Sequence, residues 1–160
     1  MRPTAGGIRD FLDYWMYGVL KSARDLGNTR VFLRQVQEES FRKFMETERL
    51  ELPPAGDPVS VIRAYSHDFD ARGILGTDDV VIGGDRDDVR LEIGAGCPYR
   101  STCRWIHDEG EPIPCFQAIA LSEVLRRVCD EDFAWTLRSF GVPCAFTLNP
   151  THMEAFRDGI

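Results

Sequence analysis

Two pairs of short, alternating apolar runs, each pair joined by a tight turn, constrain this fold most strongly. The first pair, Val80–Ile82 and Val89–Ile93, flanks the turn-rich segment GGDRDD. The second pair, residues 133–137 and 144–148, is joined by the turn Gly141–Pro143. Runs separated by such short turns pair antiparallel with each other. The sequence therefore predicts a four-stranded antiparallel sheet made of two hairpins.

Helical periodicity dominates the chain before the first hairpin. Apolar residues recur at spacings of three and four over residues 8–26, 29–50 and 58–73. A further helix is expected over residues 116–128, between the two hairpins. Because the helices gather first and there is no alternation of strand, helix and strand, we predict an α+β fold with the N-terminal helices packed on one face of the sheet.

Length and composition indicate one domain. The chain has 160 residues, of which 43% are hydrophobic and 28% are charged, values typical of globular proteins. A chain of this size buries about 70% of the surface that its unfolded form exposes, so it needs no disulfides to fold. No repeat or linker divides it. We therefore treat residues 1–160 as a single domain, with a helical part over 1–52 and a sheet-containing part over 57–150.

The first helix carries more large apolar side chains than one buried face requires. Tyr14, Trp15, Met16 and Tyr17 are consecutive, so they cover much of the helix circumference. A well-buried helix is one explanation, and a helix that also meets a second subunit is the other. We predict a homodimer that forms through residues 1–52.

Net charge and hydropathy limit the partners and the compartment. The net charge of -7 at pH 7 repels phosphate backbones, which argues against nucleic acid. No window approaches about 18 consecutive apolar residues, and residues 1–11 lack the pattern of a signal peptide. We therefore predict a cytoplasmic protein with no membrane partner. In that reducing compartment, the five cysteines are expected to be thiols or thiolates.

Residues 97–115 carry the strongest chemical signal in the sequence. Three cysteines and a histidine fall within this segment, which is polar and has a proline near each end. This composition predicts a loop rather than part of the core. Soft ligands on a loop indicate a metal ion or a reactive thiol. The four residues are Cys97, Cys103, His107 and Cys115.

Cys144 joins this group through the expected fold. If the two hairpins lie side by side, the start of the last strand reaches the end of the strand that leads to Cys97. A free cysteine has a pKa near about 8.5, so a thiolate at neutral pH needs nearby positive charge. We predict Zn²⁺ bound by Cys97, Cys103, Cys115 and Cys144, with His107 as a substitute for any of them. An iron–sulfur cluster suits four thiolates almost equally and stays open as the alternative.

A cysteine enzyme is the rival interpretation. Cys97 follows the run Gly94–Gly96, whose backbone can fold closely around a ligand. Cys97 would be the nucleophile, His107 the base, and a neighbouring acidic residue would orient the imidazole. The sequence does not show the oxyanion donors that such chemistry needs, so we assign no catalytic residue. Cys129 lies on the apolar side of its helix and is expected to be a small buried hydrophobe.

Three short motifs of the second half occur together. A hairpin runs into Cys97–Tyr99, a cysteine opens the next helix at Cys115, and the last strand pair carries a Gly-x-x-Cys-x-Phe pattern over residues 141–146. In this combination, residues 57–150 resemble the 4-vinyl reductase family. Members of that family are small-molecule-binding domains related in fold to certain subunits of the transport-particle tethering complexes.

The resemblance implies a small-molecule-binding or sensor function. Members are α+β domains, often dimeric through their early helices, with an apolar pocket for a hydrophobic or aromatic ligand. Several sensors of aromatic compounds carry a cysteine-rich zinc site near that pocket. On this basis, four residues are expected to bind the ligand: Phe69, Phe116, Trp135 and His107.

The chain departs from the sensor pattern at one place. Cys115 and Cys144 correspond to cysteines of that pattern. Sensor members usually have a glutamate and a cysteine on the penultimate strand, where this chain has residues such as Trp135. The resemblance therefore leaves Cys97 and Cys103 as the expected remaining ligands of the zinc ion. A capping-box spacing in the tail also predicts a short final helix after residue 151.

Overall fold

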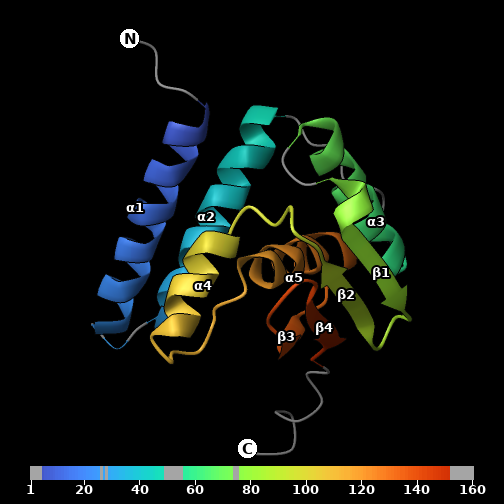
Figure 1. Ribbon diagram of the computed structural model, residues 1–160. Helices are drawn as coiled ribbons and strands as arrows, with labels where there is room; N and C mark the ends of the chain where they lie inside the picture. The colour runs from blue at the N-terminus through green and yellow to red at the C-terminus, as the bar shows by residue number, and fades with distance from the viewer. Residues whose placement is uncertain (1–4, 26, 28, 49–55, 74–75, 152–160) are drawn as a thin grey trace, which may run out of the picture.

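The structure is a computed structural model that describes residues 5–25, 27, 29–48, 56–73 and 76–151. Five α-helices and a four-stranded antiparallel sheet of strand order β1-β2-β4-β3 make up this part of the chain (Figure 1). The predicted α+β class, with helices ahead of a sheet built from two hairpins, is confirmed. The elements in chain order are α1 (Ala5–Asp25), α2 (Thr29–Glu48), α3 (Pro58–Ala71), the short 3-10 helix η1 (Thr77–Asp79), β1 (Val80–Gly84), β2 (Val89–Ile93), α4 (Arg100–Asp108), α5 (Phe116–Cys129), β3 (Phe133–Ser139) and β4 (Cys144–Pro150).

The sheet buries one face and exposes the other. Leu91 and Phe146 point into the core and are each 1% exposed, whereas Arg90 and Thr136 lie on the solvent side. Helices α3 and α5 pack over the buried face (Figure 1). This is the alternation expected of an antiparallel sheet that is covered on one side. The tail helix expected after residue 151 lies outside the described residues.

The two hairpins lie side by side through β2 and β4. Their register pairs Ile93, the last residue of β2, with Cys144, the first residue of β4. The turn that follows β2 leads directly to Cys97. The approach of the two hairpins that the sequence analysis required is therefore present.

The predicted loop over residues 97–115 is wrong in its central part, which forms helix α4. Residues 100–108 were expected to be a loop, but they form a nine-residue helix. Thr102, Cys103 and Ile106 are buried at helical spacing, while the remaining positions are polar and mostly exposed, apart from the half-buried Trp105. The prolines flank the helix rather than interrupt it, and Gly110, at φ 75°, follows its end. A short helix with a narrow apolar stripe has too few apolar residues to stand out in the sequence.

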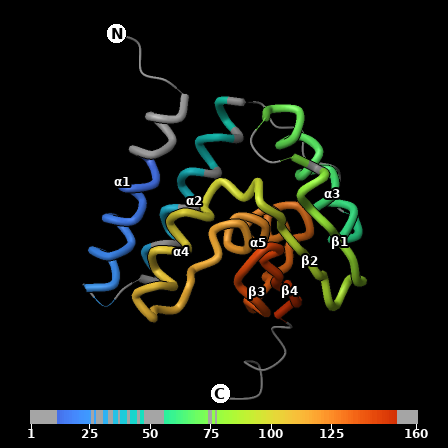
Figure 2. The backbone as a smooth tube through the Cα atoms, viewed as in Figure 1, coloured from blue at the N-terminus to red at the C-terminus, as the bar shows by residue number. Residues whose placement is uncertain are grey.

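A second, smaller core joins α1 to the rest of the molecule. It is built from Leu20 of α1, Cys103 and Ile106 of α4, and Phe116 at the start of α5. Helix α1 therefore packs beside α4 and away from the sheet (Figure 2). This arrangement creates the two cavities described below, one near each end of α4.

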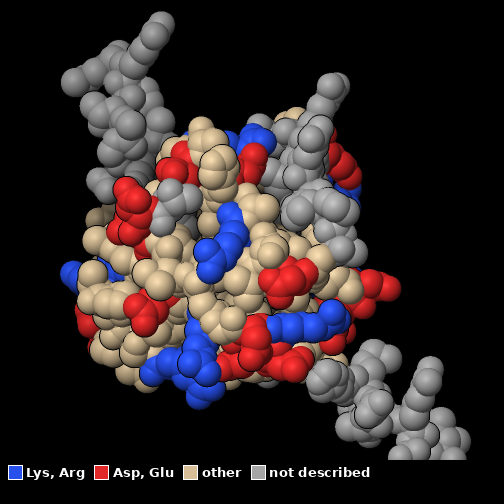
Figure 3. Space-filling view, turned by 90° about the vertical axis from the view of Figure 1, so that its right-hand side faces the viewer, with Lys and Arg blue, Asp and Glu red and all other residues tan. Residues whose placement is uncertain are grey.

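The face on the side of α3 and β1 mixes charges of both signs (Figure 3). Ion pairs such as Arg72–Asp68 and Arg90–Asp88, each 2.6 Å, join neighbouring side chains. Exposed pairs of this kind contribute little to stability. Within the part of the chain that the structure describes, we find no helix with the length and apolar character needed to cross a membrane.

Candidate functional site

Four cysteine side chains line one small cavity between the sheet, α4 and the start of α5. The cavity has a volume of about 20 Å³. Each thiol comes from a different segment: Cys97 from the turn after β2, Cys103 from α4, Cys115 from the residue that caps α5, and Cys144 from the first position of β4. The fold thus brings together all four cysteines that the sequence analysis selected as metal ligands.

The thiols do not form a closed coordination sphere as they stand. Across the described ranges, no group of three or more histidine, cysteine, aspartate or glutamate side chains has the arrangement needed to hold a metal ion. Among the described residues, Cys103, Cys115, Cys129 and Cys144 are free thiols. The four thiols therefore share a cavity without yet converging on a single point.

Arg100 ties together the two backbone segments that carry Cys97 and Cys144. Its Nη1 donates a hydrogen bond to the carbonyl oxygen of Gly141, and its Nη2 donates to that of Gly94. The guanidinium group also lines the cysteine cavity, where its buried Nε has no hydrogen-bond partner among the described residues. A positive charge therefore stands beside the thiols, with one donor unused.

Burial controls the ionisation of these thiols. Burial raises the pKa of Cys115 to about 12, although backbone N–H groups in the first turn of α5 oppose the shift. Burial, helped by the neighbouring cysteines, raises the pKa of the Cys103 thiol well above its ordinary value. The pKa of Cys144 is also raised by burial, and Arg100 only partly offsets this. Without a bound cation, these three thiols are protonated at neutral pH.

The glycines before Cys97 allow a close approach of the chain to Asp79. A Cβ atom on Gly96 would lie 2.1 Å from Oδ2 of Asp79, and a Cβ atom on Gly94 would lie 2.5 Å from Oδ1. The N–H of Gly94 also donates to the carbonyl oxygen of Asp79 at 2.7 Å. Only glycine fits here without displacing the carboxylate, so these contacts fix where Cys97 enters the cavity.

The four residues expected to bind a ligand are spread over the molecule. Phe116 lines the cysteine cavity. His107 is 57% exposed on α4, where its ring lies 5.0 Å from that of Phe140. Phe69 and Trp135 are partly buried against the main core. His107 is not among the residues that line the cysteine cavity, so the geometry offers no support for a pairing of Cys97 with His107.

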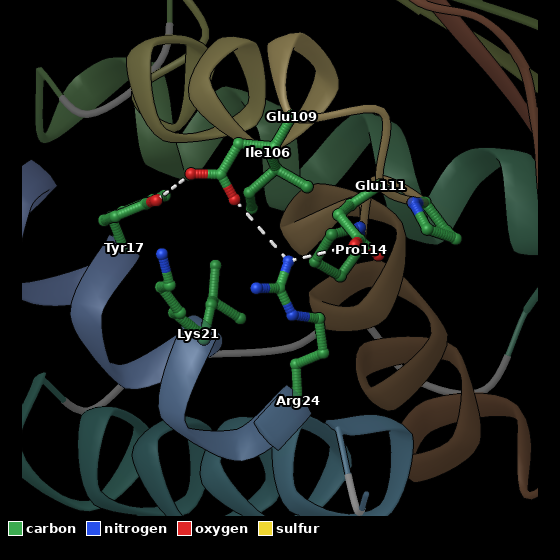
Figure 4. A pocket seen from close by; sticks show the side chains of 9 residues that line it. Tyr17, Lys21, Arg24, Ile106, Glu109, Glu111 and Pro114 are labelled. Carbon is green, nitrogen blue, oxygen red and sulfur yellow. Dashed lines mark hydrogen bonds and ion pairs between the residues drawn. The ribbon is translucent and has the colours of Figure 1, made fainter.

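A larger pocket, which the sequence analysis missed, opens between α1 and α4 (Figure 4). Its volume is about 210 Å³. Part of its wall comes from one side of α1, and the rest comes from the end of α4 and the loop that follows. The spacing of the α1 members was visible in the sequence, but their partners on α4 depend on the fold. The lining residues are Tyr17, Leu20, Lys21, Arg24, Ile106, Glu109, Glu111, Pro112 and Pro114.

Comparisons with protein-family models and with curated proteins give no match to this sequence. The fold and its cavities define the chain as an α+β domain with a cysteine-lined cavity beside a larger pocket. The resemblance to the 4-vinyl reductase family stays an interpretation of its short motifs.

Proposed function

We propose that this chain is a cytoplasmic small-molecule-binding or sensor domain in which Cys97, Cys103, Cys115 and Cys144 bind one Zn²⁺ ion. The observation that carries the proposal is that four thiols from four segments line one cavity of about 20 Å³. A cavity needs roughly 10–15 Å³ to hold one water-sized particle. This volume suits a single ion, and it is too small for an organic ligand or for a cluster of several iron and sulfide atoms.

Zinc binding changes the ionisation of the thiols. A divalent cation lowers the pKa of each coordinated thiol and so overcomes the effect of burial. Four thiolates around Zn²⁺ leave a net negative charge, which the guanidinium of Arg100 on the cavity wall offsets in part. Zinc–sulfur bonds are about 2.3 Å long, so binding requires the cysteine side chains to change rotamer and draw inward.

The proposed ion adds a covalent-strength link between four segments that packing and the hydrogen bonds of Arg100 already hold close together. Two of these segments also border the larger pocket. Helix α4 carries Cys103 and the pocket residue Ile106, and Cys115 directly follows the pocket residue Pro114. A zinc ion therefore stabilises one wall of the pocket where a small molecule would bind. The family resemblance supports the same combination of metal site and ligand pocket.

We also propose a homodimer, as the sequence analysis predicted. Six of the eight most exposed large apolar side chains among the described residues lie on α1 and α2. Large exposed apolar side chains that concentrate on two elements favour an interaction surface there. We expect Trp15→Glu to produce a monomer in sedimentation velocity and Val142→Glu, on the β3–β4 turn, to leave the dimer intact. The six side chains are Leu12, Tyr14, Trp15, Val31, Phe32 and Val36.

Metal analysis of the purified full-length chain tests the zinc site. After expression in zinc-supplemented medium, we expect about one zinc ion per chain. Cys97→Ser and Cys144→Ser should lose most of it. Cys129→Ser is the matched control, because Cys129 is not among the residues that line the cavity and its Sγ lies 3.7 Å from the carbonyl oxygen of Gly56. A folded chain that takes up no zinc in a direct titration would refute the proposal.

A further inference from the structure

The pocket between α1 and α4 has an apolar floor and a charged rim (Figure 4). Leu20, Ile106, Pro112 and Pro114 supply the apolar surface. Pockets for drug-sized ligands usually have volumes of about 300–1,000 Å³. The volume of this one, about 210 Å³, therefore limits the ligand to a body of roughly one ring.

The two carboxylates on the rim already have partners. Nη1 of Arg24 lies 3.5 Å from Oε2 of Glu109 and 3.2 Å from Oε1 of Glu111. The hydroxyl of Tyr17 donates a hydrogen bond to the other oxygen of Glu109. This hydrogen bond, assisted by the charges of Lys21 and Arg24, lowers the pKa of Glu109, so the carboxylate stays charged. A cationic ligand would have to compete with Arg24 for both carboxylates.

Lys21 differs from the other charged residues of the rim. Its ammonium group projects into the pocket in Figure 4 and lies 5.8 Å from the centroid of the Tyr17 ring. No carboxylate of the described residues lies within ion-pair distance of this ammonium. Lys21 therefore offers a positive charge with unused N–H donors beside an apolar surface.

We propose that this pocket binds a small monocarboxylate with an apolar body, such as an aromatic carboxylate. The ligand's carboxylate accepts hydrogen bonds from the Lys21 ammonium, and its ring covers Leu20 and Ile106. A dianion such as phosphate would lack the apolar contacts and would meet the repulsion of Glu109 and Glu111. The proposal rests on the small-molecule-binding part of the proposed function, and the proposed zinc ion contacts none of the residues that would bind the ligand.

An NMR titration of the full chain with benzoate and with benzamide, its neutral analogue, tests the proposal. Hydrogen bonds to a charged group are worth enough that benzoate should bind about tenfold more tightly than benzamide. Lys21→Met should remove this preference, and Lys21→Arg should keep most of it. The matched control is Lys43→Met, because Lys43 is 75% exposed on α2 and pairs with Glu46 at 3.9 Å. Inorganic phosphate should not bind.

Two results would overturn the inference. Equal affinity for benzoate and benzamide would exclude an anion-selective site, and an unchanged preference in Lys21→Met would place the binding elsewhere. Zinc content, measured on the same samples, separates this failure from that of the metal site. A zinc-loaded chain without the benzoate preference contradicts the pocket alone. A zinc-free chain that prefers benzoate supports the pocket and contradicts only the metal site.

Discussion

The two cavities near opposite ends of α4 differ in size and in electrostatics, although they share one stretch of chain. The cysteine cavity, about 20 Å³, is lined by thiols whose ionisation burial suppresses, and Arg100 is the cation beside them. The α1–α4 pocket, about 210 Å³, has a rim of ionised groups of both signs around an apolar floor. The volume of each cavity and the ion pairs already present in it together determine which class of ligand it can bind. The first cavity suits one soft cation and the second suits a small organic anion.

Removal of zinc is expected to have the largest effect, and it should act on the cysteine side. A ligand that binds only the folded state stabilises it by about 4 kcal/mol when its free concentration exceeds the dissociation constant roughly 1,000-fold. Chelation should therefore lower the melting temperature of the wild type and of Cys129→Ser. The melting temperature of Cys144→Ser should hardly respond. Equal decreases in melting temperature in all three proteins would show that zinc does not bind in the cysteine cavity.

Truncation of Ile106 should act on the pocket side. Ile106 is 7% exposed, belongs to the small core with Leu20 and Phe116, and lines the α1–α4 pocket. We expect Ile106→Ala to cost about 2–3 kcal/mol in chemical unfolding, near the lower end for such truncations because a pocket already adjoins the site. Benzoate binding should weaken while zinc content persists. Loss of zinc with intact benzoate binding would reverse the assignment of the two cavities.

The glycine contact beneath Cys97 should show a smaller effect. In Gly96→Ala the new methyl group meets the Asp79 carboxylate, which must swing away, so we expect a cost of about 1–2 kcal/mol. A second substitution, Asp79→Ser, should recover most of this cost in a double-mutant cycle. The control is Gly83→Ala in β1, where a Cβ atom meets nothing within 4 Å. If the effects of the two substitutions on the free energy of unfolding simply add, the contact between residue 96 and Asp79 contributes nothing to stability.

The smallest expected effect concerns the charge of Glu109 at the pocket rim. Its lowered pKa means that the folded state favours the ionised form. The stabilisation is therefore present above the ordinary pKa of 4.5 and is lost as the pH falls through the lower pKa of the folded state. Glu109→Gln should melt slightly earlier than wild type at pH 7, and the difference should vanish in strong acid. A difference in melting temperature that grows as the pH falls would contradict this prediction.

The sheet could be predicted from the sequence because each of its hairpins is formed by a short, continuous segment of the chain. The alternating runs and their turns fix both hairpins, and from them follows the approach of Cys144 to the strand that leads to Cys97. Helix α4 could not be predicted, because its buried stripe holds only Thr102, Cys103 and Ile106 in a segment that is otherwise polar except for Trp105. Because α4 was not predicted, its contact with α1 could not be predicted either.

Of the two candidate sites, only the group of cysteines could be predicted from the sequence. The choice of cysteines followed from residue type and hairpin topology, and all four line one cavity. The α1–α4 pocket was missed because its ion pairs join residues far apart in the chain, Arg24 with Glu109 and Glu111. The expected ligand-binding residues Phe69 and Trp135 are partly buried against the main core and line neither of the two cavities, so their role stays a prediction. An aromatic residue in the sequence carries no mark that separates a pocket wall from ordinary core.

X-ray absorption at the zinc edge of the full-length chain tests the central claim most directly. Four cysteine ligands predict a single first shell of four sulfur atoms at about 2.3 Å from the zinc ion. A first shell of oxygen or nitrogen atoms, or fewer than three sulfur atoms in zinc-loaded protein, would contradict the proposal that these four thiols bind the ion.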